Sequence, residues 1–190
     1  MADMKQQLID YLTQGREALL WKLEGLDDYD VRRPLVPTGT NLLGLVKHGA
    51  ITAGGYFGIT FDRPIDEIAW VLDDDVDWLA DLWAPAEESR QDVIDLWHRL
   101  WAHCDETISS LPLDAPGRVP WWADDRSDVT LGRILLHMTA ELHRHAGHAD
   151  IVRELIDGAA GLRADNSNLP DGQDWQSHHD RVEASAHAHR

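Results

Sequence analysis

The sequence predicts an all-α protein, a four-helix bundle with extra short helices and a C-terminal tail. Two observations indicate this class. Long segments repeat their apolar residues at helical spacing, and no segment outside turns shows the sustained alternation of a β-strand. Four such segments, joined by connections of varied length, are typical of helices that each bury one face against the others.

The chain has 190 residues, which is long enough to bury a core within one domain. We expect residues 1–161 to form the bundle. A turn-rich stretch, NSNLPDG, follows it. Residues 162–190 are therefore expected to form a linker and a short polar helix at about 174–186, which packs on the bundle or trails it.

The first two helices are expected at residues 4–23 and from Thr40 or Asn41 to Tyr56. Either Thr40 or Asn41 can cap the second helix, because a short polar side chain accepts a hydrogen bond from the exposed backbone N–H groups there. Between these helices and the third, residues 61–85 are mixed and predict one short helix with loops.

The third helix is expected at residues 87–111 and the fourth at 129–157, where Gly158 ends it. A single apolar stripe runs along the third helix: Val93, Trp97, Leu100, Trp101, Cys104, Ile108 and Leu111. Cys104 lies within that stripe, so we interpret it as a buried residue rather than a reactive thiol.

Composition excludes several kinds of partner. Lys and Arg number 17 and Asp and Glu 34, giving a formal net charge of −17. Such a chain repels phosphate backbones and anionic lipid, so we expect neither nucleic acid nor membrane as a partner. The single cysteine allows no disulfide within the chain, and no signal peptide or membrane-spanning stretch is evident. We therefore expect a cytoplasmic protein.

The segment ELHRHAGHAD, residues 141–150, concentrates imidazole and carboxylate groups in the fourth helix. On a helical wheel, Glu141 and His145 fall one turn apart within the apolar arc. His137 and His148 lie at the edges of that arc, and His143 points away and is expected to be solvated.

A carboxylate in a helix core is costly unless it is paired or bound to a metal. Glu oxygen and His nitrogen suit zinc, nickel or iron, with zinc the first expectation. His48 lies on the inward face of the second helix and offers a third ligand. The alternative is that Glu141, His145 and His48 form a hydrogen-bonded network in the core.

The sequence resembles the DinB-like four-helix bundle family, including the group known as DUF664. The matching stretches cover most of the chain: RRPLVPTGTNLLGLVKHGAITAGGYFG, LDAPGRVPWW, TLGRILLHMTAELHRHAGHADIVRELIDGAAGL and NSNLPDG. The resemblance implies a divalent metal held by His48, Glu141 and His145, a ligand set similar to that of mycothiol-dependent maleylpyruvate isomerase. His148 also matches the family motif, and we expect it beside the ligands or lining the pocket, as we do His137.

The family resemblance further implies a transferase or isomerase that uses a small thiol of the mycothiol type. Three protein ligands leave a position open for water or a thiolate, and the metal makes either one nucleophilic. A small-molecule substrate would lie against Tyr56, Trp121 and Trp122, since pockets favour aromatic walls. Arg33, Arg126 and Arg153 are candidates to bind a substrate carboxylate.

We expect no full second domain after the bundle, only the tail from Leu162, which would be a departure from the isomerase. Two alternatives therefore stand beside the enzyme: a metal- or ligand-binding module without catalysis, such as a stress-related accessory protein, and a purely structural network without metal. We also expect that a bundle of this size can form a homodimer, because two-fold dimers are the commonest soluble oligomers.

Overall fold

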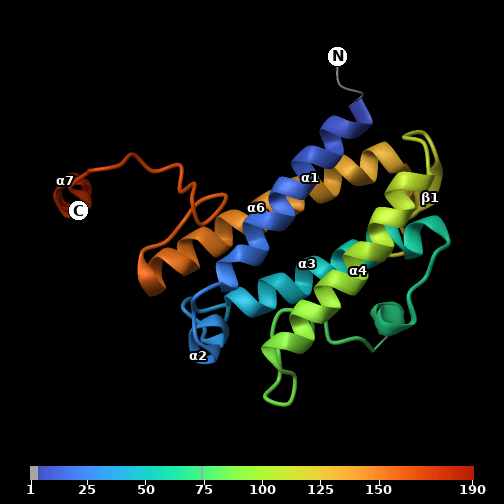
Figure 1. Ribbon diagram of the computed structural model, residues 1–190, viewed down its shortest axis with the longest axis horizontal. Coiled ribbons are helices and arrows are strands. Elements are labelled where there is room, and N and C mark those ends of the chain that lie inside the picture. Colours follow the sequence, from blue (N-terminus) through green and yellow to red (C-terminus); the bar gives the residue numbers. More distant parts are fainter. Residues whose placement is uncertain (1–3, 74) are drawn as a thin grey trace.

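The computed structural model describes residues 4–73 and 75–190, and its fold is the predicted helical bundle. The four long helices are α1 (Met4–Leu20), α3 (Leu42–Phe57), α4 (Arg90–Ser110) and α6 (Leu131–Asp157). Helix α3 packs mainly against α4 and α6, and α1 packs mainly against α6 (Figure 1). Because α3 also contacts α1, it touches all three other long helices and lies at the centre of the bundle.

The ends of the long helices follow from local chemistry. Asn41 caps α3, its side chain accepting a hydrogen bond from the Gly44 N–H at 2.8 Å. Ser89 and Asp92 form a reciprocal capping box at the start of α4. Helix α6 ends at Gly158, whose φ of +79° is a left-handed conformation that glycine adopts without strain.

The structure differs from the sequence prediction in two places. The first helix was expected to continue to residue 23, but it tightens into the 3₁₀ helix η1 (Trp21–Leu23). No strand was expected, yet β1 (Pro116–Arg118) pairs antiparallel with β2 (Asp128–Thr130). Strands of three residues are too short to produce a recognisable alternation, so the sequence pattern could not reveal them.

Short helices fill the connections between the long ones: α2 (Asp28–Arg32), η2 (Ile59–Phe61), η3 (Asp66–Leu72) and α5 (Asp124–Ser127). The long connection from Gly58 to Ser89 contains η2 and η3 and lies along α3 and α4. This connection matters for the site described below, because it supplies one wall of a cavity.

The core is continuous through the bundle and includes the predicted stripe of α4. Trp97 and Trp101 are buried there and their rings pack 5.7 Å apart between centroids. Cys104 is fully buried, and burial raises the pKa of its thiol. The thiol is therefore protonated and inaccessible, as expected for a core residue.

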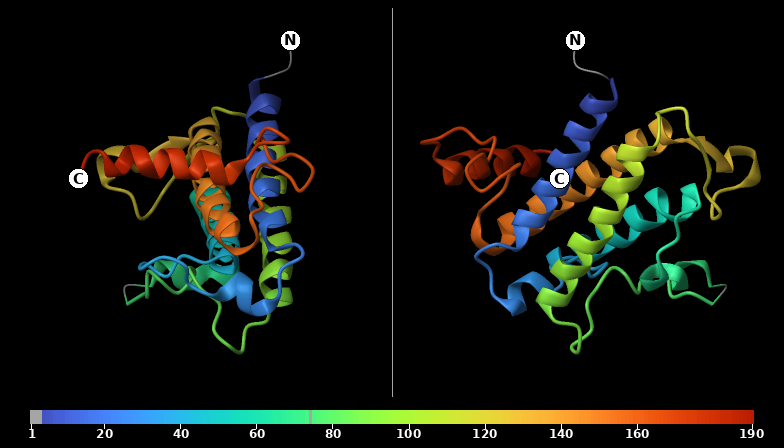
Figure 2. Two further views of the ribbon diagram at one scale, coloured as in Figure 1. Left: turned by 90° about the vertical axis from the view of Figure 1, so that its left-hand side faces the viewer. Right: turned by 45° about the vertical axis from the view of Figure 1, so that its right-hand side comes forward.

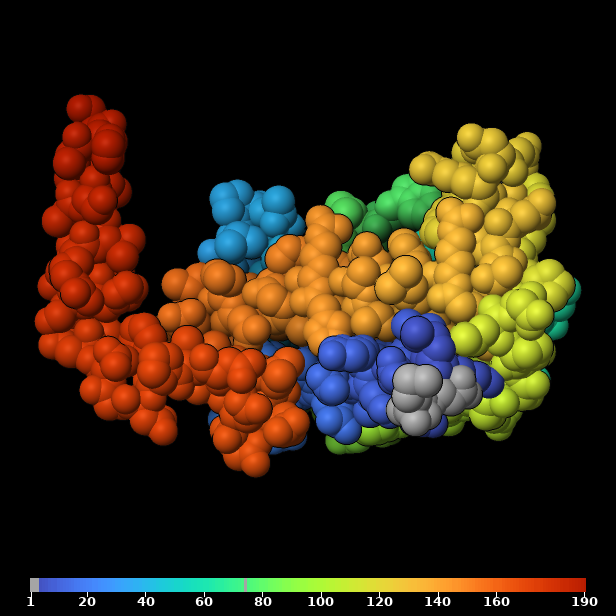
Figure 3. Space-filling view, turned by 90° about the horizontal axis from the view of Figure 1, so that it is seen from above, coloured from blue at the N-terminus to red at the C-terminus, as the bar shows by residue number. Residues whose placement is uncertain are grey.

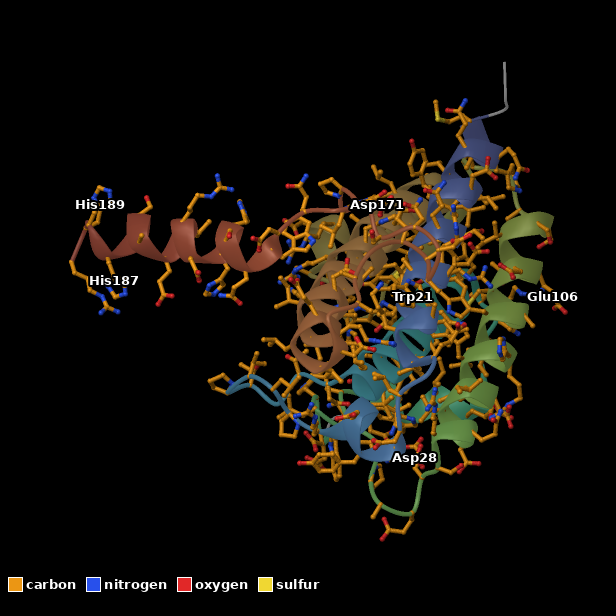
Figure 4. The ribbon with its side chains drawn as sticks, turned by 60° about the vertical axis from the view of Figure 1, so that its left-hand side comes forward. Trp21, Asp28, Glu106, Asp171, His187 and His189 are labelled. Atoms are coloured by element: carbon orange, nitrogen blue, oxygen red, sulfur yellow. The ribbon has the colours of Figure 1, made fainter. Side chains whose placement is uncertain are left out.

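The C-terminal tail, unlike the bundle, contains a helix that is exposed along its whole length. Its helix α7 (Trp175–His187) has no buried residue and extends away from the long helices (Figures 2 and 3). Figure 4 shows His187 and His189 at the far end of this helix. Within the residues that the structure describes, no helix is both long enough and apolar enough to cross a membrane.

Candidate functional site

Helices α3 and α6 bring two predicted residues together from distant parts of the sequence. The rings of His48 and His145 meet edge to face, 4.9 Å apart between centroids at an interplanar angle of 83°. His48 is half-buried on α3, and the side chain of His145 on α6 is 15% exposed. The two imidazoles thus form the centre of the candidate site.

His48 is oriented by a carboxylate that sequence reasoning missed. Its Nδ1 lies 2.7 Å from Oδ2 of Asp81, and the Thr52 hydroxyl lies 3.5 Å from the ring. Asp81 belongs to the irregular connection after η3, where no periodicity predicts which way a side chain faces. The bond at Nδ1 leaves Nε2 as the ring nitrogen of His48 that can bind a ligand.

His145 is buried without a complete set of partners. Its Nδ1 is enclosed and makes no hydrogen bond within the described residues. Burial, together with the neighbouring His48, lowers its pKa to about 4, although Glu141 acts in the opposite direction. The ring is therefore neutral at neutral pH, which is the form that can coordinate a metal.

Glu141 lies next to His145 but is held loosely. Its Oε2 is 3.8 Å from Nε2 of His145 and 3.9 Å from Nη1 of Arg144, and its side chain is 32% exposed. No hydrogen bond to its carboxylate is present in residues 4–73 and 75–190. Over the same residues, no three His, Cys, Asp or Glu side chains are arranged so that they could hold a metal ion as they stand.

Two further histidines of α6, His148 and His137, lie near the imidazole pair in different surroundings. His148 is exposed, and its ring lies 5.6 Å from that of His145. His137 packs against Tyr56 at 4.8 Å and Trp122 at 5.1 Å between ring centroids, and burial lowers its pKa.

His143 points away from the apolar arc, as expected, but it is half-exposed rather than fully solvated. Its Nε2 donates a hydrogen bond to the backbone carbonyl of Tyr11 at 3.0 Å, which places the ring between α6 and α1. Gly15 of α1 permits this approach, since a Cβ there would lie 3.1 Å from Cβ of Leu142 and 3.3 Å from Cδ2 of His143. His143 is therefore a packing residue.

Tyr56, Trp121 and Trp122 gather at one side of the histidines. The Tyr56 hydroxyl oxygen accepts hydrogen bonds from Nε1 of Trp122 at 3.0 Å and from Nε1 of Trp121 at 3.4 Å. Trp121 lies directly on α3 because Gly55 has no side chain; a Cβ there would be 3.0 Å from the indole ring. These contacts fix an aromatic wall beside the imidazole pair.

A cavity of about 220 Å³ opens between this wall and the connection that follows α3. His48, Thr52, Tyr56, Trp121 and Asp81 line one part of it. The connection supplies further residues that sequence reasoning did not identify: Trp70, Val71, Val76, Asp77 and Trp78. The abundance of tryptophan was a signal for aromatic walls, but nothing in the pattern distinguished these two tryptophans from those of the core.

The arginines suggested as carboxylate binders do not line this cavity. Arg153 is buried elsewhere and bonds to Asp157 and to backbone carbonyls. Arg33 pairs with Asp30 at 2.7 Å, and Arg126 is exposed on α5. Their predicted role in this cavity is wrong, because sequence alone could not show which of the long basic side chains faced it.

A four-helix bundle whose α3 and α6 each present a histidine to a shared interior is a protein of the DinB-like class. The family model for mycothiol-S-transferase, a DinB-like family, matches residues 7–158. The chain therefore belongs to the mycothiol-S-transferase family, which confirms the resemblance seen in the sequence. A comparison with curated proteins finds no match.

Proposed function

We propose that this protein is a metal-dependent transferase that joins the thiol of mycothiol to an electrophilic small molecule. The observation that supports this most directly is the His48–His145 pair, in which a neutral, largely enclosed imidazole has a nitrogen without a hydrogen-bond partner among the described residues. Family membership supplies the thiol and the reaction class. We also place the protein in the cytoplasm, where a small thiol stays reduced.

The residues present fit a divalent cation. Nε2 of His48 and a ring nitrogen of His145 would bind it, and Glu141, whose carboxylate is not fixed by any hydrogen bond in the described residues, would rotate to complete the set. Two imidazoles and one carboxylate are typical ligands for zinc and also accept nickel or iron. The bound cation would lower the pKa of a thiol beside it, which supplies a thiolate at neutral pH.

The remaining residues of the site have separate tasks. Asp81 holds the His48 ring in one orientation, as a carboxylate commonly does for a metal-binding histidine. The aromatic wall offers apolar surface to a bound substrate. The Tyr56 oxygen already accepts two indole N–H groups, so its own hydrogen is left to donate to the substrate or to the departing group.

The chemistry is a substitution at an electrophilic carbon. The sulfur forms a new bond to that carbon, the leaving group departs with its bonding electrons, and the thiol proton passes to solvent. Binding of the electrophile in the cavity, next to a thiol held at the imidazole pair, contributes by converting a bimolecular encounter into a reaction of bound groups.

The test is conjugation of mycothiol to monochlorobimane, measured by mass spectrometry of the product, with the full chain loaded with zinc, nickel or iron. We expect a metal-dependent conjugate with mycothiol, and less or none with glutathione. His48→Ala, His145→Ala and Glu141→Gln should each lose activity. His98→Ala is the matched control, since His98 is exposed on α4.

Metal content should be measured in parallel on the full chain and on a chain ending at residue 173, because α7 carries histidines of its own. A stoichiometric metal without any conjugate, across a panel of electrophiles, would contradict the enzyme and support a binding module. A conjugate formed equally well by the His145→Ala variant would exclude this site.

A further inference from the structure

The cavity beside the imidazole pair combines aromatic rings with negative charge. Tyr56, Trp70, Trp78 and Trp121 contribute four rings, and Asp77 and Asp81 contribute two carboxylates. Among the described residues that line it, none is Lys or Arg. A cavity built to take an anionic substrate would need a basic group to pair with it.

The arrangement places rings on several sides of the space. Tyr56 and Trp121 meet at 5.2 Å between centroids on the α3 side. Trp78 is 73% exposed, so it lies at the mouth, where a bound molecule would cover it. Asp77 precedes it and uses Oδ1 to accept the Leu79 N–H at 2.9 Å, which holds the carboxylate at the same rim.

Two basic side chains on the neighbouring helices α3 and α6 have other partners. Lys47 pairs with Glu88 at 2.7 Å, and the guanidinium of Arg133 lies 5.0 Å above the Trp122 ring. A divalent cation at the imidazole pair would be balanced by Glu141 and Asp81. Asp77 would then keep the rim negative, in a chain whose formal charge is already −17.

We propose that the electrophile bound by this cavity is an organic cation, with an apolar body of about the size of one ring and an ammonium group. Aromatic faces attract such a cation through their quadrupoles, and a nearby carboxylate adds Coulomb attraction. The cavity volume of about 220 Å³ suits a single ring, since an apolar cavity of roughly 150 Å³ can bind benzene. The identification of the ligand as the electrophile rests on the proposed function, whereas the preference for a cation rests on the cavity alone.

The test compares three probes of nearly equal size: benzylammonium, benzyl alcohol and benzoate. Binding to the full chain is measured by isothermal titration calorimetry at physiological ionic strength, without thiol. We expect benzylammonium to bind about tenfold more tightly than benzyl alcohol. Benzoate should bind most weakly of the three.

Four variants test which residues cause the preference for benzylammonium. Asp77→Asn should reduce the advantage of benzylammonium over benzyl alcohol severalfold, and Trp78→Ala should weaken both probes. Asp75→Asn and Trp83→Ala are the matched controls, because they lie in the same connection, are exposed and do not line the cavity. The controls should leave all three affinities unchanged.

Binding of benzoate as tight as that of benzylammonium would overturn the proposal. So would a cation preference that Asp77→Asn leaves intact, because this would trace the preference to the net charge of the chain rather than to the cavity. Neither result depends on turnover. The cavity proposal and the transferase proposal can therefore fail separately.

Discussion

Helix α6 takes part in two clusters of polar side chains, about two turns apart along the helix, and they are built in opposite ways. Around Lys22 and Arg153, every charged group has partners. The Lys22 ammonium, fully buried, donates to the carbonyls of Ala18 at 2.9 Å and Gly161 at 2.6 Å, and lies 3.1 Å from Asp150. Around His145, an enclosed nitrogen has no hydrogen-bond partner within the part of the chain that the structure describes, and the Glu141 carboxylate is loosely held.

The difference separates a structural role from a functional one. Burial lowers the pKa of Lys22, but its three partners compensate for much of the cost of enclosing it. Arg153 likewise donates to the carbonyls of Lys22 at 2.7 Å and Glu24 at 2.9 Å. These bonds join α1, α6 and the start of the tail. The enclosed nitrogen of His145 has no such partner within the described residues, and the proposed function gives it a metal as its partner.

The largest effect is expected from His145→Leu. This change should lower metal affinity and transferase activity by roughly 100-fold or more, because it removes a proposed ligand. In the metal-free protein it should not reduce stability, since it replaces a buried nitrogen without a hydrogen bond by an apolar group. Urea unfolding of metal-free wild type and variant checks this. A marked loss of stability in the metal-free variant would mean that His145 has a structural role like that of Arg153, which would contradict the comparison.

Arg153→Met should have the reverse effect: a loss of stability without a loss of activity. We expect it to lower the free energy of unfolding by about 3 kcal/mol, because two backbone carbonyls and Asp157 lose a buried donor. Activity per folded molecule should stay unchanged. Arg144→Met, an exposed change on the same helix, is the control for urea unfolding. A stable but inactive Arg153→Met protein would restore the substrate-binding role that the structure argues against.

Asp81→Asn should weaken metal binding by about tenfold, because an amide orients an imidazole less strongly than a carboxylate does. Competition with a chelator of known affinity measures the change. Asp114→Asn, an exposed substitution outside the cavity, should have no effect. An unchanged affinity in Asp81→Asn would remove Asp81 from the site.

His137 should contribute to the pH dependence of the free energy of unfolding. Burial lowers its pKa below the usual 6.5, so the unfolded chain binds a proton before the folded one does as the pH falls. The contribution to stability is complete above pH 6.5 and is lost as the pH falls through the folded-state pKa. We expect His137→Gln to flatten unfolding profiles in this range, and the exposed His98→Gln to leave them unchanged.

The smallest effect is expected from removing α7. A chain ending at residue 173 should match the full chain within about 0.5 kcal/mol, because no residue of α7 is buried. A chain ending at residue 160 should lose more, about 1–3 kcal/mol, since it lacks the Gly161 carbonyl that accepts from Lys22 and from Trp21. Equal stability of the two truncated chains would show that this anchoring contributes nothing.

The predicted elements of the fold followed from local patterns. Apolar periodicity located the four long helices, and Asn41 and Gly158 marked two of their ends, because capping depends on residues adjacent in sequence. The same periodicity put His48 and His145 on inward faces, and the structure brings their rings together. The resemblance to a family added the expected ligand set, which stays a prediction until a metal is measured.

The tertiary structure decided which distant groups meet. Asp81, Asp77 and Trp78 lie in an irregular connection, where neither a period of 3.6 nor of 2 tells which side chains face inward. Lys22 and Gly161 contact each other across most of the chain, and Arg153 joins them although the sequence analysis gave it as a candidate to bind a substrate carboxylate. Local sequence determines helices because their hydrogen bonds are local. The partners of a buried charge depend on how the helices and loops are packed.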